Sequence, residues 1–124
     1  MAKKIIVIDD SRTARQQVSA TLTAADYDVI EAVDGRDGLL TIRTHADAAL
    51  VICDVNMPQM NGLEMLRALR VEQPGVVMPI IMLTTEAQPA LLQQAKQSGA
   101  RGWIVKPFKP EMLLAAVRKL CGDT

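Results

Sequence analysis

Aromatic side chains are scarce in this sequence of 124 residues, which has one Trp, one Tyr and one Phe. Surfaces that bind single-stranded nucleic acid stack bases on aromatic rings, and nucleic-acid binders in general carry excess positive charge. Here 14 acidic residues balance 14 basic ones. We therefore expect no nucleic-acid partner.

Long apolar runs and cysteine pairs are missing too. The longest nearly apolar stretch, residues 76–83, contains Pro79 and is far shorter than the roughly 20 residues that span a bilayer, so we expect no membrane insertion. Residues 1–4 lead directly into an apolar run and leave no room for a signal peptide. The two cysteines, Cys53 and Cys121, form no CxxC motif, which favours reduced thiols in a cytoplasmic protein.

What the sequence does have is a regular alternation of short apolar runs and helical patterns. The runs cover residues 4–8, 27–33, 49–54, 78–84 and 102–105, and apolar residues at helical spacing follow each of them. Such alternation predicts a parallel sheet with right-handed crossovers and helices on both faces. The predicted fold class is therefore α/β and doubly wound, in one domain over residues 1–124 without an internal linker.

Local signals predict where several elements begin. Ser11 is suited to cap the first helix, Asp34 and Gly35 predict a turn before the second, and Pro110 opens the last helix. Lys109, at the cap position of that last helix, offers no acceptor to the unpaired amides. We therefore expect this helix to fray unless packing holds it.

Four of the apolar runs end in residues that commonly bind metal or phosphate. These are Asp9 and Asp10 after the first run, Asp54 in the third, Thr84 in the fourth and Lys106 after the fifth. In open parallel sheets, ligands bind outside the carboxyl ends of the strands, where the strand order reverses. The sequence thus predicts that these side chains gather in one crevice.

Three carboxylates in one crevice need compensation, because two unit charges about 4 Å apart repel by about 4 kcal/mol at an effective dielectric constant of about 20. Oxygen ligands without nearby His or thiolate indicate Mg²⁺. Structural roles remain open at this stage. Asp9, Asp10 and Ser11 could simply cap the first helix, Lys106 could be a counter-ion, and Thr84 could be ordinary turn chemistry.

Taken together, these motifs resemble the receiver domain of two-component response regulators, above all the stand-alone receivers of chemotaxis. The order, spacing and strand-end placement agree across the whole chain. The matching segments are Val7–Ser11, Asp54–Pro58, Met60–Gly62, Leu83–Thr84 and Lys106–Phe108. The resemblance implies a flavodoxin-like (βα)5 fold with the strand order 2-1-3-4-5.

The resemblance also implies the chemistry of the site. Asp54 would be the phosphoacceptor, which takes a phosphoryl group from a sensor histidine kinase or phosphotransfer protein and forms an acyl phosphate. Lys106 and the Thr84 hydroxyl would hold phosphoryl oxygens. A cis peptide bond is implied between Lys106 and Pro107. Such a domain is catalytic only in its own phosphorylation and dephosphorylation.

Metal binding and phosphoryl lifetime are implied in the same way. Mg²⁺ would be bound directly by Asp10 and Asp54, through water by Asp9, and by the backbone carbonyl of Asn56. The side chains of Asn56 and Glu86 flank the phosphoacceptor in such domains and tune the lifetime of the phosphoryl group. This pair suggests a short-lived phosphoryl state.

The switch of such domains couples a threonine to an aromatic residue, here Thr84 and Trp103. Phosphorylation would change the face made by the helix after strand four, strand five and the last helix. This face is the expected binding site for an unknown target protein, and its polar positions include Gln93, Gln94, Gln97 and Lys119. The receiver itself is expected to be a monomer. A Trp stands where Tyr or Phe is usual, and it could instead only cover the sheet edge.

Three other classes of protein deserve comparison. A phosphatase or phosphotransferase of the haloacid-dehalogenase type would place an Asp-x-Asp nucleophile on the first strand, whereas this chain has Asp9-Asp10. A flavodoxin-like electron carrier would need a Ser-, Thr- and Gly-rich phosphate loop there. A pseudo-receiver that binds partners without phosphorylation is disfavoured because every site residue is present. His45, the single histidine, is given no phosphorelay role.

Overall fold

The structure is a computed structural model that describes residues 2–85 and 88–121. In that part of the chain, five strands alternate with five helices, as the sequence predicts. The elements are β1 (Lys4–Ile8), α1 (Arg12–Ala24), β2 (Asp28–Ala32), α2 (Gly35–Thr44), β3 (Leu50–Asp54), α3 (Gly62–Glu72), β4 (Ile80–Thr84), α4 (Pro89–Gln97), β5 (Gly102–Val105) and α5 (Pro110–Cys121).

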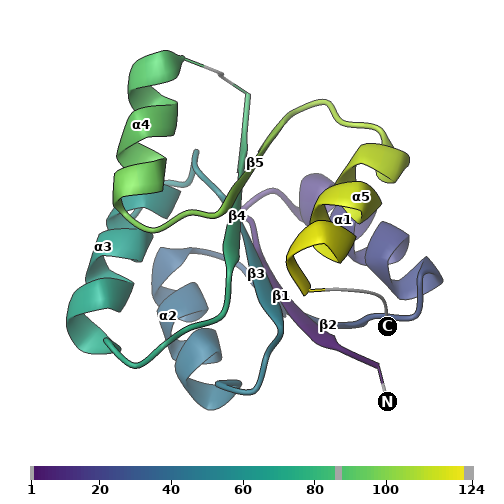
Figure 1. Ribbon diagram of the computed structural model, residues 1–124, viewed down its shortest axis with the longest axis horizontal. Helices are drawn as coiled ribbons and strands as arrows, with labels where there is room; N and C mark the ends of the chain where they lie inside the picture. The colour runs from purple at the N-terminus through teal and green to yellow at the C-terminus, as the bar shows by residue number, and fades with distance from the viewer. Residues whose placement is uncertain (1, 86–87, 122–124) are drawn as a thin grey trace.

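The sheet has the order β2-β1-β3-β4-β5, and every neighbouring pair is parallel (Figure 1). This order confirms the predicted doubly wound fold. β2 lies at an edge, which explains its mixed polarity. From β1 the chain crosses to β2 on one side and later returns to β3 on the other, so the strand order reverses beside β1. The carboxyl ends of β1 and β3 are therefore neighbours at the place where such sheets bind ligands.

Helices cover both faces of the sheet. α2, α3 and α4 lie on one face, and α1 and α5 lie on the other (Figure 1). All residues of β3 and β4 are buried, as expected for central parallel strands that have helices on both sides. Among residues 2–85 and 88–121, no helix combines the length and the apolar character that a bilayer crossing requires.

The helix starts agree with the sequence signals in part. The Ser11 hydroxyl accepts a hydrogen bond from the Ala14 amide at 3.2 Å, as predicted. The turn predicted at Asp34 and Gly35 is confirmed at Asp34 only, because Gly35 is already the first residue of α2. The Asp34 carboxylate caps this helix by accepting from the Asp37 amide at 2.8 Å. A Cβ on Gly35 would lie 2.8 Å from the Met60 side chain. This glycine therefore serves close packing.

The last helix is held by packing. Leu113 and Val117 are fully buried against the sheet. At the start of α5, the backbone carbonyl of Lys109 accepts from the amides of Met112 and Leu113. The side chain of Lys109 cannot accept, so packing supplies what the cap does not.

Candidate functional site

Three carboxylates meet at the carboxyl ends of β1 and β3. Asp9 and Asp10 directly follow β1, and Asp54 is the last residue of β3. Each offers one oxygen, and these oxygens all lie within 4.8 Å of one another. Asp9 and Asp54 are buried, whereas Asp10 is exposed. The predicted acidic crevice is present, with one side open to solvent.

Asp9 is fixed from several directions. Its Oδ1 accepts from the Ser11 amide at 2.9 Å, and its Oδ2 accepts from Lys106 Nζ at 3.0 Å. Arg15 Nη1 donates to the Asp9 backbone carbonyl at 2.8 Å, and Arg15 Nε forms an ion pair with Glu31 at 2.8 Å. The sequence pattern did not indicate this role of Arg15. Its one signal was its position a single helical turn after the capping Ser11.

Asp54 is a buried carboxylate with an available oxygen. It is 3 % exposed, and its Oδ1 lies 3.3 Å from Lys106 Nζ but has no well-aligned hydrogen bond among the described residues. Burial and the neighbouring charge of Asp9 raise the pKa of Asp54 to about 6, against the opposing effect of Lys106. Burial therefore makes the charged form of this carboxyl group costly.

Lys106 is the cation that the carboxylates share. Burial alone would lower its pKa, but the hydrogen bond to Asp9 and the charges of Asp54 and Asp9 outweigh that effect and raise it. The ammonium therefore stays charged. The Lys106–Pro107 peptide bond is cis, as the resemblance implied. Three carboxylates around one ammonium leave excess negative charge, and their oxygens are the ligands that Mg²⁺ prefers. The residues present thus fit this ion.

Two further residues lie in the loops around the crevice. Thr84 ends β4, is fully buried, and its backbone carbonyl accepts from the Lys106 amide at 2.7 Å. Asn56 is exposed, and its Nδ2 donates to the hydroxyl of Thr85 at 3.2 Å. The sequence pattern indicated no role for Thr85. Glu86 lies outside the described residues.

Comparison with known proteins identifies the family of this chain. Residues 5–118 match the response regulator receiver domain. The chain belongs to this family. It is 39% identical over 120 residues to a chemotaxis protein CheY homolog of Campylobacter jejuni, covering 96% of this chain and 92% of that protein. It is 38% identical to the chemotaxis protein CheY1 of Helicobacter pylori strain J99, with 96% and 97% covered.

Solved structures agree with the receiver fold. The chemotaxis protein CheY4 of Vibrio cholerae, crystallised at low pH, superposes with a TM-score of 0.90 at 42% identity, over 97% of this chain and 99% of that one. A CheY-like receiver domain of Methanospirillum hungatei gives a TM-score of 0.86 at 28% identity, over 96% and 93%. Receiver domains are phosphoacceptor switches that bind Mg²⁺ at an acidic pocket and act between histidine kinases and downstream targets. Family membership therefore sets aside the dehalogenase and electron-carrier alternatives.

Trp103 of the receiver lies away from the acidic crevice. It pairs with Met82 in the sheet and packs half-buried on the face that α4 covers, where it lines a hollow of about 330 Å³ with Leu92 and Ala95. Its indole Nε1 is buried without a hydrogen-bond partner among the described residues. Side chains alternate along strands, so Thr84, two residues beyond Met82, falls on this same face.

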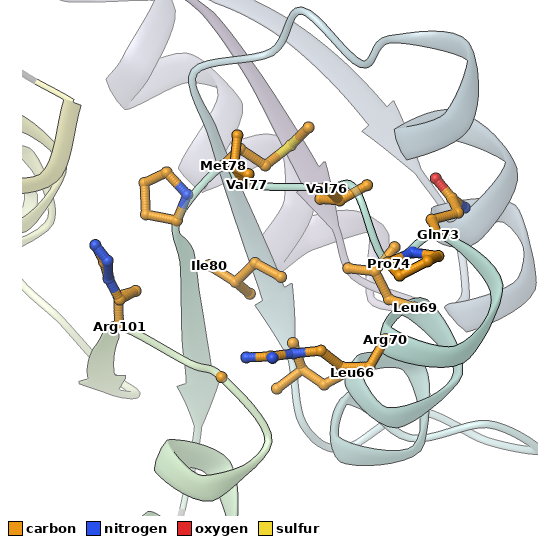
Figure 2. A pocket seen from close by; sticks show the side chains of 12 residues that line it. Leu66, Leu69, Arg70, Gln73, Pro74, Val76, Val77, Met78, Ile80 and Arg101 are labelled. Carbon is orange, nitrogen blue, oxygen red and sulfur yellow. The ribbon is translucent and has the colours of Figure 1, made fainter.

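Two more hollows frame the receiver. One, of about 500 Å³, adjoins the crevice between α1 and the loop after β5, and Gln17, Thr85, Lys106 and Phe108 line it. The other lies at the amino ends of the strands, opposite the crevice, between the end of α3 and the start of β4 (Figure 2). It shares no residue with the acidic crevice.

Proposed function

We propose that Asp54 accepts a phosphoryl group from the phosphohistidine of a sensor histidine kinase or phosphotransfer protein. A carboxylate oxygen attacks phosphorus, the phosphorus–nitrogen bond of the donor breaks, and an acyl phosphate forms on Asp54. One observation carries the proposal: Oδ1 of this buried carboxylate lies 3.3 Å from an ammonium yet is not engaged in a well-aligned hydrogen bond within the described part of the chain.

The neighbouring residues have distinct proposed roles. Lys106 and the Thr84 hydroxyl hold phosphoryl oxygens, so that positive charge and a donor face the transferred group. Asp10 and Asp54 would hold Mg²⁺ directly, Asp9 through water and Asn56 through its backbone carbonyl. When bound, the ion would offset the negative charge of the phosphoryl oxygens. The side chains of Asn56 and Glu86 set the lifetime of the acyl phosphate.

We further propose that the switch is read on the face formed by α4, β5 and α5. Thr84 and Trp103 share one sheet face, and Trp103 lines a hollow together with Leu92 and Ala95 of α4, which supports a coupling between them. Val105 and Met112 are 40% and 60% exposed on β5 and α5 and offer apolar contacts to a target protein. In this proposal, residues 1–124 form a single receiver domain. The receiver is a monomer and works in the cytoplasm.

The donor protein has to reach Asp54 from the open side of the crevice. The hollow between α1 and the loop after β5 adjoins Lys106 and is lined partly by Ala14 and Phe108. A helix that carries the phosphohistidine would fit against these apolar residues while the phosphoryl group faces Asp54. Substitution of Phe108 by Asp should then slow transfer from the kinase but leave phosphorylation by a small donor unchanged.

The decisive experiment is intact mass spectrometry after incubation with Mg²⁺ and acetyl phosphate. We expect one added phosphoryl group on the parent chain and on the control Asp28→Asn, an exposed acidic residue of β2, but none on Asp54→Asn. Fluorescence of Trp103, the single Trp of the chain, should change together with the mass. Lack of an adduct on the parent, or its persistence in Asp54→Asn, would overturn the proposal.

A further inference from the structure

The hydrogen bond between Asn56 and Thr85 ties together the two loops that frame Asp54. Asn56 follows Asp54 by two residues in the loop after β3, and Thr85 is the first residue after β4. Asn56 Nδ2 donates to Thr85 Oγ1 at 3.2 Å. Both residues are exposed, so this bond contributes little to folding. It does restrict the rotation of the carboxamide beside the phosphoacceptor.

The direction of this bond matters for the other end of the carboxamide. The NH₂ group of Asn56 donates to Thr85, so the amide oxygen Oδ1 remains available as an acceptor. No described residue donates a hydrogen bond to this oxygen. A water molecule that attacks a phosphoryl group needs an acceptor to orient it. A carboxamide held at its nitrogen presents that acceptor in a defined place.

We propose that Thr85 is a positioning residue for hydrolysis of the acyl phosphate, because its hydroxyl fixes the Asn56 carboxamide so that Oδ1 orients the attacking water. The proposal rests on the proposed function of Asp54. In the step, the water oxygen bonds to phosphorus and the bond between phosphorus and the Asp54 oxygen breaks. Asp54 leaves as a carboxylate, and hydrogen phosphate and one proton go to solvent.

The experiment times the loss of the phosphoryl group. The receiver is phosphorylated with acetyl phosphate, freed from the donor by desalting, and followed in Mg²⁺ buffer by intact mass. Thr85→Val removes the hydroxyl and keeps the shape, whereas Thr85→Ser keeps the hydroxyl. Thr44→Val is the matched control, because Thr44 lies outside the hollow that Thr85 lines and its hydroxyl donates to the Leu40 carbonyl within α2.

We expect Thr85→Val to lose the phosphoryl group roughly 2- to 10-fold more slowly, the range that one hydrogen bond supports. Thr85→Ser and Thr44→Val should decay like the parent chain. In an Asn56→Ala background, Thr85→Val should have no further effect, because the carboxamide that it positions is gone. A merely structural role of Thr85 would not depend on Asn56 in this way.

Other results would overturn the inference. These are an unchanged or faster decay in Thr85→Val, failure of Thr85→Ser to restore the rate, or an equal effect in the Asn56→Ala background. Failure of the proposed function is distinguishable, since the parent chain would then carry no phosphoryl group on Asp54 before any decay is timed. An adduct that decays without regard to Thr85 would overturn this inference alone.

Discussion

Asp54 carries a charge that the fold makes costly. The side chain is almost fully buried, Asp9 repels it, and the shared ammonium of Lys106 offsets only part of this. Burial and repulsion by Asp9 destabilise the charged form of this carboxylate. The same features favour the binding of a cation and the attachment of a phosphoryl group, because both alter the charge at this carboxylate. Stability and function should therefore oppose each other at this residue.

We predict that Asp54→Asn stabilises the chain in Mg²⁺-free buffer at neutral pH by about 1 to 2 kcal/mol, since each pKa unit is worth about 1.4 kcal/mol. The pKa of Asp54 is raised from 3.8 to about 6. Within this window the folded chain keeps a proton that the unfolded chain has lost, so the free energy of unfolding falls as the pH rises through it. Screening by solvent and the lost ion pair of Lys106 reduce the full gain.

Urea unfolding at several pH values in EDTA measures this effect. The parent chain should lose stability between pH 3.8 and about 6, Asp28→Asn should behave like the parent, and Asp54→Asn should show a flatter profile. Equal profiles in all three proteins would show that the pKa of Asp54 is not raised in the folded state.

The sequence predicted which residues meet at the crevice but not how they are held. Asp9, Asp54 and Lys106 could be placed because strand ends of a parallel sheet share one edge. Arg15 and Thr85 could not, because their contacts depend on the paths of loops and on side-chain rotamers, which no periodicity in the sequence encodes. For the same reason Trp103 could be placed on β5, while the hollow that it lines together with α4 required the structure.

At the scale of elements, the start of α3 packs against the end of β3, the strand that carries Asp54. Asn61 and Glu64 form a reciprocal capping box there, and Gly62 lies against the end of β3. A Cβ on Gly62 would lie 2.5 Å from the backbone oxygen of Asp54 and 2.6 Å from the methyl group of Met82. A backbone atom of a central strand cannot move away, so only glycine fits here.

We therefore predict that Gly62→Ala destabilises the chain by about 1 to 3 kcal/mol, the usual cost of overpacking. It should also slow phosphorylation by acetyl phosphate, since Asp54 would be displaced. Gly75→Ala is the matched control, because a Cβ there would have no neighbour within 4 Å. Thermal unfolding compares the two variants, and equal midpoints would contradict the prediction.

The start of α5 offers the opposite case, an element that can be improved. Lys109 provides no side-chain acceptor at the cap position before Pro110, so Lys109→Ser should stabilise the chain relative to Lys109→Ala by about 0.5 to 1 kcal/mol. Both variants remove the same charge, and their difference isolates the cap. If urea unfolding gave the same stability for Ser and Ala, packing of Leu113 and Val117 would already fix the helix start.

Sequence signals at element starts differed in how well they could be interpreted. Ser11 has one common role before a helix, and the structure confirms it. Gly35 follows Asp34 in a pair that usually indicates a turn, yet it begins α2, which Asp34 caps, and it packs closely against Met60. That contact joins residues 25 positions apart in the sequence, so local turn chemistry could not predict it.

At the scale of the whole molecule, the strand order brings together residues that are far apart in the chain. β1, β3, β4 and β5 contribute Asp9, Asp54, Thr84 and Lys106 to one edge, and this edge is complete only when the sheet is formed. Binding of a cation to the three carboxylates should therefore be linked to folding of the entire domain, since the unfolded chain does not hold the carboxylates together.

We predict that Mg²⁺ raises the thermal midpoint of the chain. At a Mg²⁺ concentration ten times the dissociation constant, the linkage relation gives about 1.4 kcal/mol, which corresponds to roughly 4 to 7 °C for a domain of this size. Asp10→Asn and Asp54→Asn each remove one proposed ligand and should lose most of this shift. Asp28→Asn should keep it, because its position on β2 lies outside the acidic cluster.

Two further comparisons make the result specific. The increase in thermal midpoint should be smaller at low pH. Asp54, with its pKa of about 6, is then protonated, and the proton competes with Mg²⁺ for the carboxylate. Na⁺ at matched ionic strength should not reproduce it, because general screening acts on all exposed charges and not on the crevice alone. An equal shift in Asp10→Asn, Asp54→Asn and Asp28→Asn would mean that Mg²⁺ stabilises the chain elsewhere, and the three carboxylates would then need another explanation for their proximity.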